Sequence, residues 1–163
     1  KIEERIQEVD IFAMAELDAF IKEHSSYSWT SYLGWFKISL GEDDSRDKLS
    51  VEIREDLIWK YTVEFIVAKK QEPSHKNKHK KYENKVVAEF EAKDKKEALN
   101  LADKVIRTNY SDRVNLVNQK AKWKAEKWTE KQISLLRRKW YNNADQLTKG
   151  QCCTLIAKIF ANK

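Results

Sequence analysis

Few residues in this chain could carry out catalysis or bind a metal. His75 and His79 stand four residues apart, a spacing that suits a metal ion on a helix, but the lysine-rich segment around Pro73 opposes a cation. Cys152 and Cys153 have no histidine or acidic residue next to them, and Cys152 falls at an apolar helical position, as a small core residue would. We therefore expect no metal site and no nucleophilic cysteine.

Motifs that hold phosphates or activate a serine are also absent from the sequence. The chain contains three glycines and no G-x-x-x-x-G-K-[ST] loop, so it has no phosphate-cradling loop of the ATPase kind. It has no G-x-S-x-G elbow, and its carboxylates are scattered without a pair that the sequence alone places together. We expect the chain to be no enzyme and to bind no cofactor. A nuclease, the remaining enzymatic alternative, would need carboxylates clustered in a cleft.

Binding of nucleic acid is the better-supported class of function. Nine basic residues lie between Lys120 and Lys149, against three acidic ones, and aromatic residues are interleaved with them. Basic groups neutralise phosphates and release counterions, and aromatic rings stack on unpaired bases, which is worth about 1–3 kcal/mol per base. The residues predicted to bind nucleic acid are Lys124, Lys127, Lys131, Arg137, Arg138, Lys149 and Trp128.

A plainer interpretation exists for these residues: the lysines could form a solvated surface, and the tryptophans could belong to a core. Trp140 is expected in the core, because it follows Ile133 and Leu136 at helical spacing. Two other segments are weaker candidates for binding. Lys69–Lys81 carries six lysines and one glutamate, so we expect a mobile loop that is either a basic arm or solvated surface. In the aromatic segment Tyr27–Phe36 most rings are expected in the core, although Trp29 or Tyr32 could be exposed.

The C-terminal stretch contains the same helix-start signal twice. Thr129 is followed by Gln132, and Thr148 by Gln151, which is the spacing of a capping box. Apolar residues recur at helical spacing after each box. The stretch therefore predicts two short helices that pack together as a helical hairpin, and their partly positive N-termini would suit a phosphate.

This stretch resembles a small module at the C-terminal ends of bacterial and phage DNA-processing proteins, among them superfamily 2 helicases of the DEAD/DEAH, XPB-like type. The matching residues are Thr129, Glu130, Lys131, Gln132, Ile133, Leu136, Leu147, Thr148, Lys149, Gly150, Leu155 and Ile156. They cover roughly a fifth of the chain, and Cys152-Cys153 departs from the pattern. The resemblance implies an accessory region of a larger helicase whose ATP-dependent motor lies outside this chain.

Charge and cysteine content limit the partners and the compartment. Residues 1–70 carry 10 basic and 15 acidic side chains, whereas residues 71–163 carry 22 and 11, so a polyanion would bind the second half. No apolar run approaches the roughly 20 residues that cross a bilayer, so we expect no membrane partner. The two adjacent cysteines predict no disulfide framework and a reducing, cytoplasmic location. Because the chain starts with Lys1, we expect it to belong to a longer protein.

Hydrophobic periodicity predicts an α+β fold. Amphipathic helices are expected over 1–23 and, capped by Asp94 and Glu97, over 95–108. Alternating apolar residues predict four strands, near 35–40, 49–53, 59–67 and 86–90. Since consecutive strands with short turns pair antiparallel, we expect an antiparallel four-stranded meander sheet covered by helices, plus a C-terminal α-helical hairpin.

The predicted domains are a sheet domain over 1–110, a basic connector over 111–127 and the helical hairpin over 128–163. In outline the sheet domain is similar to double-stranded RNA-binding domains, with Lys95 and Lys96 at the start of its second helix.

The sequence therefore predicts a non-catalytic nucleic-acid-binding accessory module of a larger DNA- or RNA-processing protein, a helicase by the resemblance. Its basic C-terminal half would bind the phosphate backbone without sequence preference. The alternative is a protein–protein interaction domain, in which the helical hairpin or the N-terminal helix docks a partner or the parent motor. An apolar patch left exposed on the folded hairpin would favour that alternative.

Overall fold

The computed structural model describes residues 15–32, 34–58, 60–71, 82–139 and 141–161, and it divides into two compact units, Lys1–Val117 and Asn118–Lys163. Within the described ranges no helix has both the length and the apolar character that a membrane span requires. Residues 15–24 are helical, and residues 1–14 of the predicted N-terminal helix lie outside the described part.

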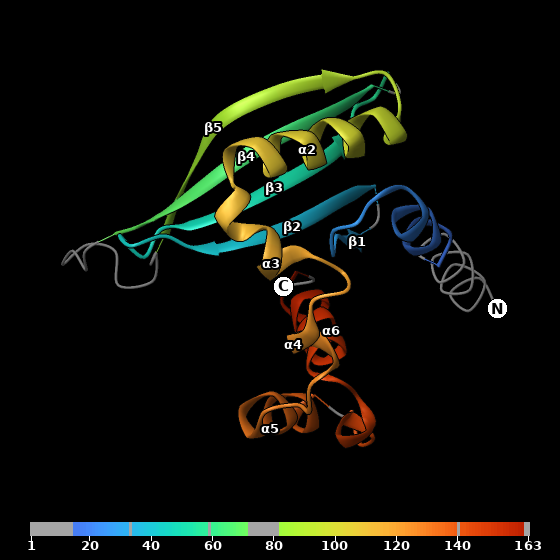
Figure 1. Cartoon of the computed structure of the whole chain (residues 1–163), viewed down its shortest axis with the longest axis vertical. Helices are drawn as coiled ribbons and strands as arrows, with labels where there is room; N and C mark the ends of the chain where they lie inside the picture. Colours follow the sequence, from blue (N-terminus) through green and yellow to red (C-terminus); the bar gives the residue numbers. More distant parts are fainter. Residues whose placement is uncertain (1–14, 33, 59, 72–81, 140, 162–163) are drawn as a thin grey trace. The chain divides into compact units, whose positions relative to one another are not determined.

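The first unit is built on a five-stranded antiparallel sheet in which each strand pairs with the next along the chain. The strands are β1 Thr30–Tyr32, β2 Trp35–Glu42, β3 Lys48–Glu55, β4 Tyr61–Lys70 and β5 Tyr82–Ala92 (Figure 1). The α+β class and the antiparallel sheet are confirmed, but the predicted number of four strands is wrong. The missed strand β1 has three residues, too few to show the alternation by which a strand is recognised.

One face of the sheet packs against α2 (Lys95–Asn109), which lies along it in Figure 1. Alternate strand residues point into this core, because successive side chains of a strand face opposite sides. The fully buried contributors are Leu40, Val51, Ile53, Val63 and Phe65 from the strands and Ala98, Leu99, Ala102 and Ile106 from α2. The predicted cap of α2 is confirmed, since Glu97 N donates to Asp94 Oδ1 at 2.8 Å.

The segment predicted as a connector, 111–127, is largely helical. It forms η1 Ser111–Arg113, α3 Val114–Val117 and α4 Lys122–Ala125. Val117 is buried in the core of the first unit, so the chain leaves this core at the end of α3.

A buried carboxylate ties the N-terminal segment to α2. The two Asp103 oxygens accept hydrogen bonds from Ser25 Oγ at 2.6 Å and from Trp29 Nε1 at 3.0 Å. Burial raises the pKa of Asp103, although the two hydrogen bonds and the charge of Arg107 act in the opposite direction. Trp29 and Tyr32 are both buried, so the expectation that one of them is exposed is wrong.

The opposite face of the sheet holds a charged cluster around Glu52 on β3. The Glu52 side chain is 8 % exposed, and its carboxylate lies 3.1 Å from Lys37 Nζ and 2.5 Å from Arg54 Nη2. Burial alone would raise the pKa of Glu52, but the hydrogen bonds and charges of Arg54 and Lys37 outweigh it and lower that pKa. Arg54 also lies 4.9 Å from the centre of the Trp35 ring, which stacks on Tyr32.

The predicted loop Lys69–Lys81 begins later than expected, because β4 and β5 stay paired as far as Lys70. Residues 72–81 lie outside the described part of the chain.

The turn between β3 and β4 presents apolar side chains to solvent. Leu57 is fully exposed and Ile58 is 71 % exposed. Asp56 Oδ1 accepts hydrogen bonds from the backbone N–H groups of Ile58 and Lys60, both at 2.9 Å. These two bonds fix the conformation of the turn, as an aspartate does when it bonds the backbone two residues on.

β5 is an edge strand: in the described residues it pairs with β4 on one side and with no strand on the other. The β4–β5 register shifts between Phe65 and Ile66, which leaves one extra residue on β5 around the exposed pair Val86 and Val87. Such an insertion is a β-bulge, which bends the strand and increases its local twist.

The second unit consists of short helices around a small core. Besides α4 they are α5 Glu130–Arg138, η2 Ala144–Gln146 and α6 Lys149–Ala161. Both predicted capping boxes are confirmed: each threonine Oγ1 accepts from the backbone N–H of its glutamine, and each glutamine Oε1 accepts from the threonine N–H. The core is made of Ile133, Leu136, Ala144 and Cys152, so the prediction that Cys152 is a core residue is also confirmed.

Helices α5 and α6 pack against each other, but not in the antiparallel manner of a hairpin. Lys127 and Thr148 form an isolated β-bridge, and Lys149 N donates to Glu126 O at 2.9 Å. The segments that precede the two helices therefore run side by side, which brings both helix N-termini together. Figure 1 shows the two helices running in different directions from there.

Candidate nucleic-acid interface

The basic excess of the chain belongs to the second unit. Residues 118–163 carry eleven basic and three acidic side chains, a net charge of +8, whereas the other 117 residues carry 21 basic and 23 acidic ones, a net charge of −2. A polyanion is therefore attracted to the helical unit rather than to the sheet.

Helix α5 displays three of the predicted binding residues to solvent, namely Lys131, Arg137 and Arg138. Lys131 and Arg138 are seven residues apart, about two helical turns, so they project from the same side. That side is opposite the buried pair Ile133 and Leu136. The helix thus buries one face and presents two aligned cations on the other.

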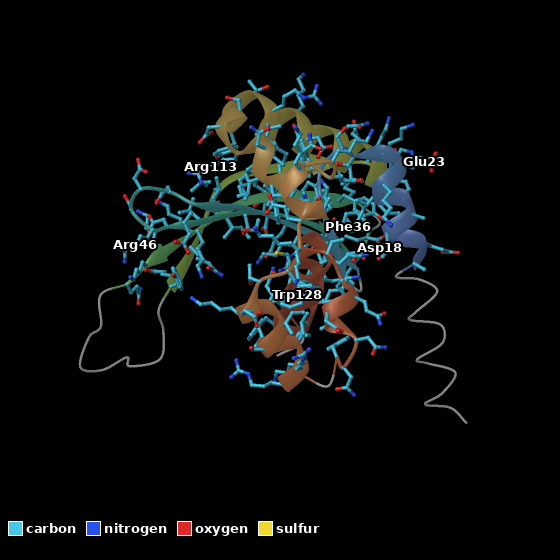
Figure 2. All side chains as sticks on the ribbon, turned by 60° about the horizontal axis from the view of Figure 1, so that its bottom comes forward. Asp18, Glu23, Phe36, Arg46, Arg113 and Trp128 are labelled. Atoms are coloured by element: carbon cyan, nitrogen blue, oxygen red, sulfur yellow. The ribbon has the colours of Figure 1, made fainter. Side chains whose placement is uncertain are left out.

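Lys127, just before α5, is also exposed, and its Nζ lies 4.8 Å from the centre of the Trp128 ring. Trp128 itself, labelled in Figure 2, is partly buried against the core of the second unit. Its Nε1 donates to Asp145 O at 2.8 Å. Trp128 therefore joins the start of α5 to the α5–α6 link, and only part of its ring surface is available for stacking on a base.

Lys124 and Lys149 are held by contacts within the protein. Lys124 is half-buried, and its Nζ donates to Asn118 O at 2.7 Å. Burial lowers the pKa of Lys124 to about 8, although the charge of Cys153 acts in the opposite direction. Lys149 Nζ forms an ion pair with Glu126 at 3.0 Å. Both lysines are engaged internally, in contrast to the exposed cations of α5.

Gly150 has a packing role that the sequence did not reveal. A Cβ added at Gly150 would lie 2.8 Å from Lys124 Cβ and 3.2 Å from Lys124 O. The missing side chain lets α4 approach the first turn of α6 closely.

An open pocket lies in the link between α5 and α6, and no prediction had assigned a function to it. Its volume is about 420 Å³, and it is lined by Tyr141, Asn142, Asn143, Ala144, Leu147 and Leu155. Asparagine favours turns, and Asn142 and Asn143 lie in this link. The sequence signal that could have indicated a binding site is Tyr141, an aromatic residue next to these two amides. Trp140, which we expected in the core, lies outside the described residues.

The sequence offered one histidine pair and one cysteine pair as candidates for metal and thiol chemistry. No three His, Cys, Asp or Glu residues gather there in a way that could hold a metal ion, and His75 and His79 lie outside those ranges. Cys153 is exposed and accepts a hydrogen bond from Gln132 Nε2 at 3.1 Å, whereas Cys152 is buried.

A family model for the C-terminal domain of mitochondrial helicase Irc3 matches residues 8–163, nearly the whole chain. The chain belongs to this family. No curated protein and no solved structure matches the chain.

Membership in the Irc3 C-terminal domain family makes this chain a helicase accessory domain, as the C-terminal stretch indicated. The match includes the sheet unit as well as the helical unit, and thus extends far beyond the residues that carried the resemblance. It does not support the bacterial or phage, XPB-like type that the resemblance suggested.

Proposed function

We propose that this chain is a non-catalytic accessory domain that holds nucleic acid for the motor of a larger helicase. The observation that carries the proposal is the net charge of +8 on residues 118–163, together with the exposed cations of α5. Family membership supplies the helicase context. Lysines and arginines that neutralise phosphates release counterions, so binding is salt-dependent and independent of sequence.

The seven predicted binding residues contribute unequally in this proposal. Lys127, Lys131, Arg137 and Arg138 are exposed and make the main phosphate contacts. Lys124, Lys149 and Trp128 have internal partners, so they support the fold of the unit and add less to binding.

The test is fluorescence anisotropy of labelled DNA and RNA oligonucleotides, titrated with the chain across a range of salt. The double variant Lys131→Glu/Arg138→Glu reverses the two aligned charges of α5. The matched control Lys96→Glu/Lys104→Glu makes the same change in net charge on exposed lysines of α2. We expect the α5 variant to lower the slope of log affinity against log salt by about 2, one unit for each lost phosphate contact.

Comparison with the α2 control decides whether α5 is a specific interface. Equal losses in both variants would mean that net charge alone matters and that α5 is no specific interface. A larger loss in the α2 variant would move the interface to the sheet unit, the arrangement suggested by the outline of double-stranded RNA-binding domains. No binding to any nucleic acid at low salt would overturn the proposal.

A second candidate function is docking onto a protein partner or onto the motor of the parent helicase. The observation that favours it is the β3–β4 turn, where the apolar side chains of Leu57 and Ile58 are exposed to solvent. Two hydrogen bonds from the backbone to Asp56 hold this turn in one conformation. Titration calorimetry of the chain against the isolated motor part tests this function. Leu57→Ser/Ile58→Ser should abolish that binding and leave nucleic-acid binding unchanged; equal binding by wild type and variant would exclude the turn.

A further inference from the structure

We propose that the pocket between α5 and α6 binds one unpaired nucleobase of the strand that the basic unit holds. The inference rests on the proposed function and deepens it, because it assigns a preference for single-stranded nucleic acid. A base in a duplex must first be unpaired and unstacked, which costs a few kcal/mol, so a base that is already unpaired enters a pocket more readily.

The pocket is open to solvent and large enough for a small flat ligand. Its volume of about 420 Å³ falls within the roughly 300–1,000 Å³ that is usual for such sites. Ala144 is buried, and Leu147 and Leu155 pack against the core of the unit, so the apolar floor is part of a fixed structure. Tyr141 is 41 % exposed and supplies an aromatic wall. A flat base would lie between an aromatic ring and aliphatic side chains, a common arrangement for unpaired bases.

The rim of the pocket supplies hydrogen-bonding groups. Asn142 and Asn143 are both exposed and line the pocket. An amide offers a donor and an acceptor side by side, which matches the paired donor and acceptor on the edge of adenine. The two amides can therefore form hydrogen bonds with a base, which a purely apolar groove could not do.

The positive charges near the pocket favour a nucleic acid as its ligand. Tyr141 N donates to Leu136 O at 3.1 Å, so Tyr141 is fixed to the last turn of α5, the turn that carries the exposed Arg137 and Arg138. A base in the pocket would leave its phosphates near these cations. Asp145 is the acidic residue of the same link, and it is not among the residues that line the pocket.

The experiment uses the full chain and three labelled DNA ligands: a short single strand, a strand of the same length that lacks all of its bases, and the duplex. Affinities are measured by anisotropy for wild type, Tyr141→Ala and Tyr141→Phe. A fluorescent adenine analogue at the central position reports stacking by its quenching. Melting followed by circular dichroism confirms that the variants are folded.

We expect Tyr141→Ala to weaken single-strand binding about tenfold, the effect of losing one stacked base. Tyr141→Phe should retain it, since the ring remains. Duplex binding and binding of the abasic strand should be the same for all three proteins. The adenine analogue should be quenched by wild type and not by Tyr141→Ala.

The outcomes separate this inference from the proposed function. Salt-dependent binding that is the same for Tyr141→Ala and wild type, and the same for intact and abasic strands, would overturn the base pocket and leave the proposed function standing. An absence of binding to all three ligands at low salt would overturn both. Loss of duplex binding in Tyr141→Ala to the same degree as single-strand binding would also overturn the inference, because a base enters from a duplex only at the cost of unpairing and unstacking.

Discussion

Substituting Gly150 by alanine tests the packing of the helical unit most directly. The added Cβ would lie 2.8 Å from Lys124 Cβ and 3.1 Å from Lys124 Cγ, well inside the roughly 3.5–4.0 Å of favourable carbon contacts. A Cβ and a backbone carbonyl cannot rotate away as the end of a side chain can. The substitution must therefore separate α4 from the first turn of α6.

Two opposing effects set the size of the change. Overpacking of this kind costs roughly 1–3 kcal/mol, whereas alanine favours a helix over glycine by at most about 1 kcal/mol. The expected net result is a loss of up to about 2 kcal/mol in the unfolding free energy of the second unit.

The assay is urea unfolding followed by NMR signals of the second unit. A second, independent readout is the titration of Lys124. Burial holds its pKa at about 8, so separating α4 from α6 should hydrate the amine and raise that pKa toward the ordinary lysine value.

A double-mutant cycle isolates the contact from other effects of the substitution. Lys124→Gly removes the Cβ that the new methyl group would meet. The double variant Lys124→Gly/Gly150→Ala should be more stable than the sum of the two single effects by about 1 kcal/mol or more. Additive effects in this cycle would show that the close approach of α4 and α6 is not what requires glycine.

Two pH-dependent predictions of opposite sign concern the sheet unit. The pKa of Glu52 is lowered, so its stabilising effect is present at neutral pH and is lost as the pH falls through the folded-state pKa; Glu52→Gln should cost about 1.5–3 kcal/mol at pH 7 and flatten the acid limb of a stability-against-pH curve. A Glu52→Gln curve that follows wild type into acid would contradict this. The pKa of Asp103 is raised, so its contribution is fully present below the unfolded-state pKa and is lost as the pH rises through the folded-state value. Asp103→Asn should therefore destabilise the protein more in acid than at neutral pH, and urea melts that show the reverse order would refute it.

Much of the fold could be predicted because it depends on local patterns. The alternation in β2 to β5 and the capping boxes at Thr129 and Thr148 depend only on residues close together in the sequence. The structure contains both features. Strand β1 was missed because three residues carry no period, and it is defined by its pairing with β2. Trp29 was misjudged because its partner, Asp103, lies 74 residues away.

The candidate site depended on contacts that the sequence does not contain. Composition correctly placed the positive charge in the C-terminal part of the chain. It could not distinguish the exposed cations from Lys124 and Lys149, whose internal partners come from the approach of other segments. The pocket at Tyr141 likewise could not be predicted from the sequence, because its floor combines Ala144 in the link with Leu155 in α6.

The bulge in β5 has a consequence for how the chain behaves at high concentration. A long, flat edge strand can recruit a strand from another molecule and grow into a fibril-like stack. In β5 the extra residue at Val86-Val87 bends the edge where its side chains are most apolar, and the charged Lys85 and Glu89 stand on either side. An incoming strand pairs best with a straight, uncharged edge, and the bend and the charges disfavour such pairing. The valines can therefore be exposed on β5 without recruiting a strand from another molecule.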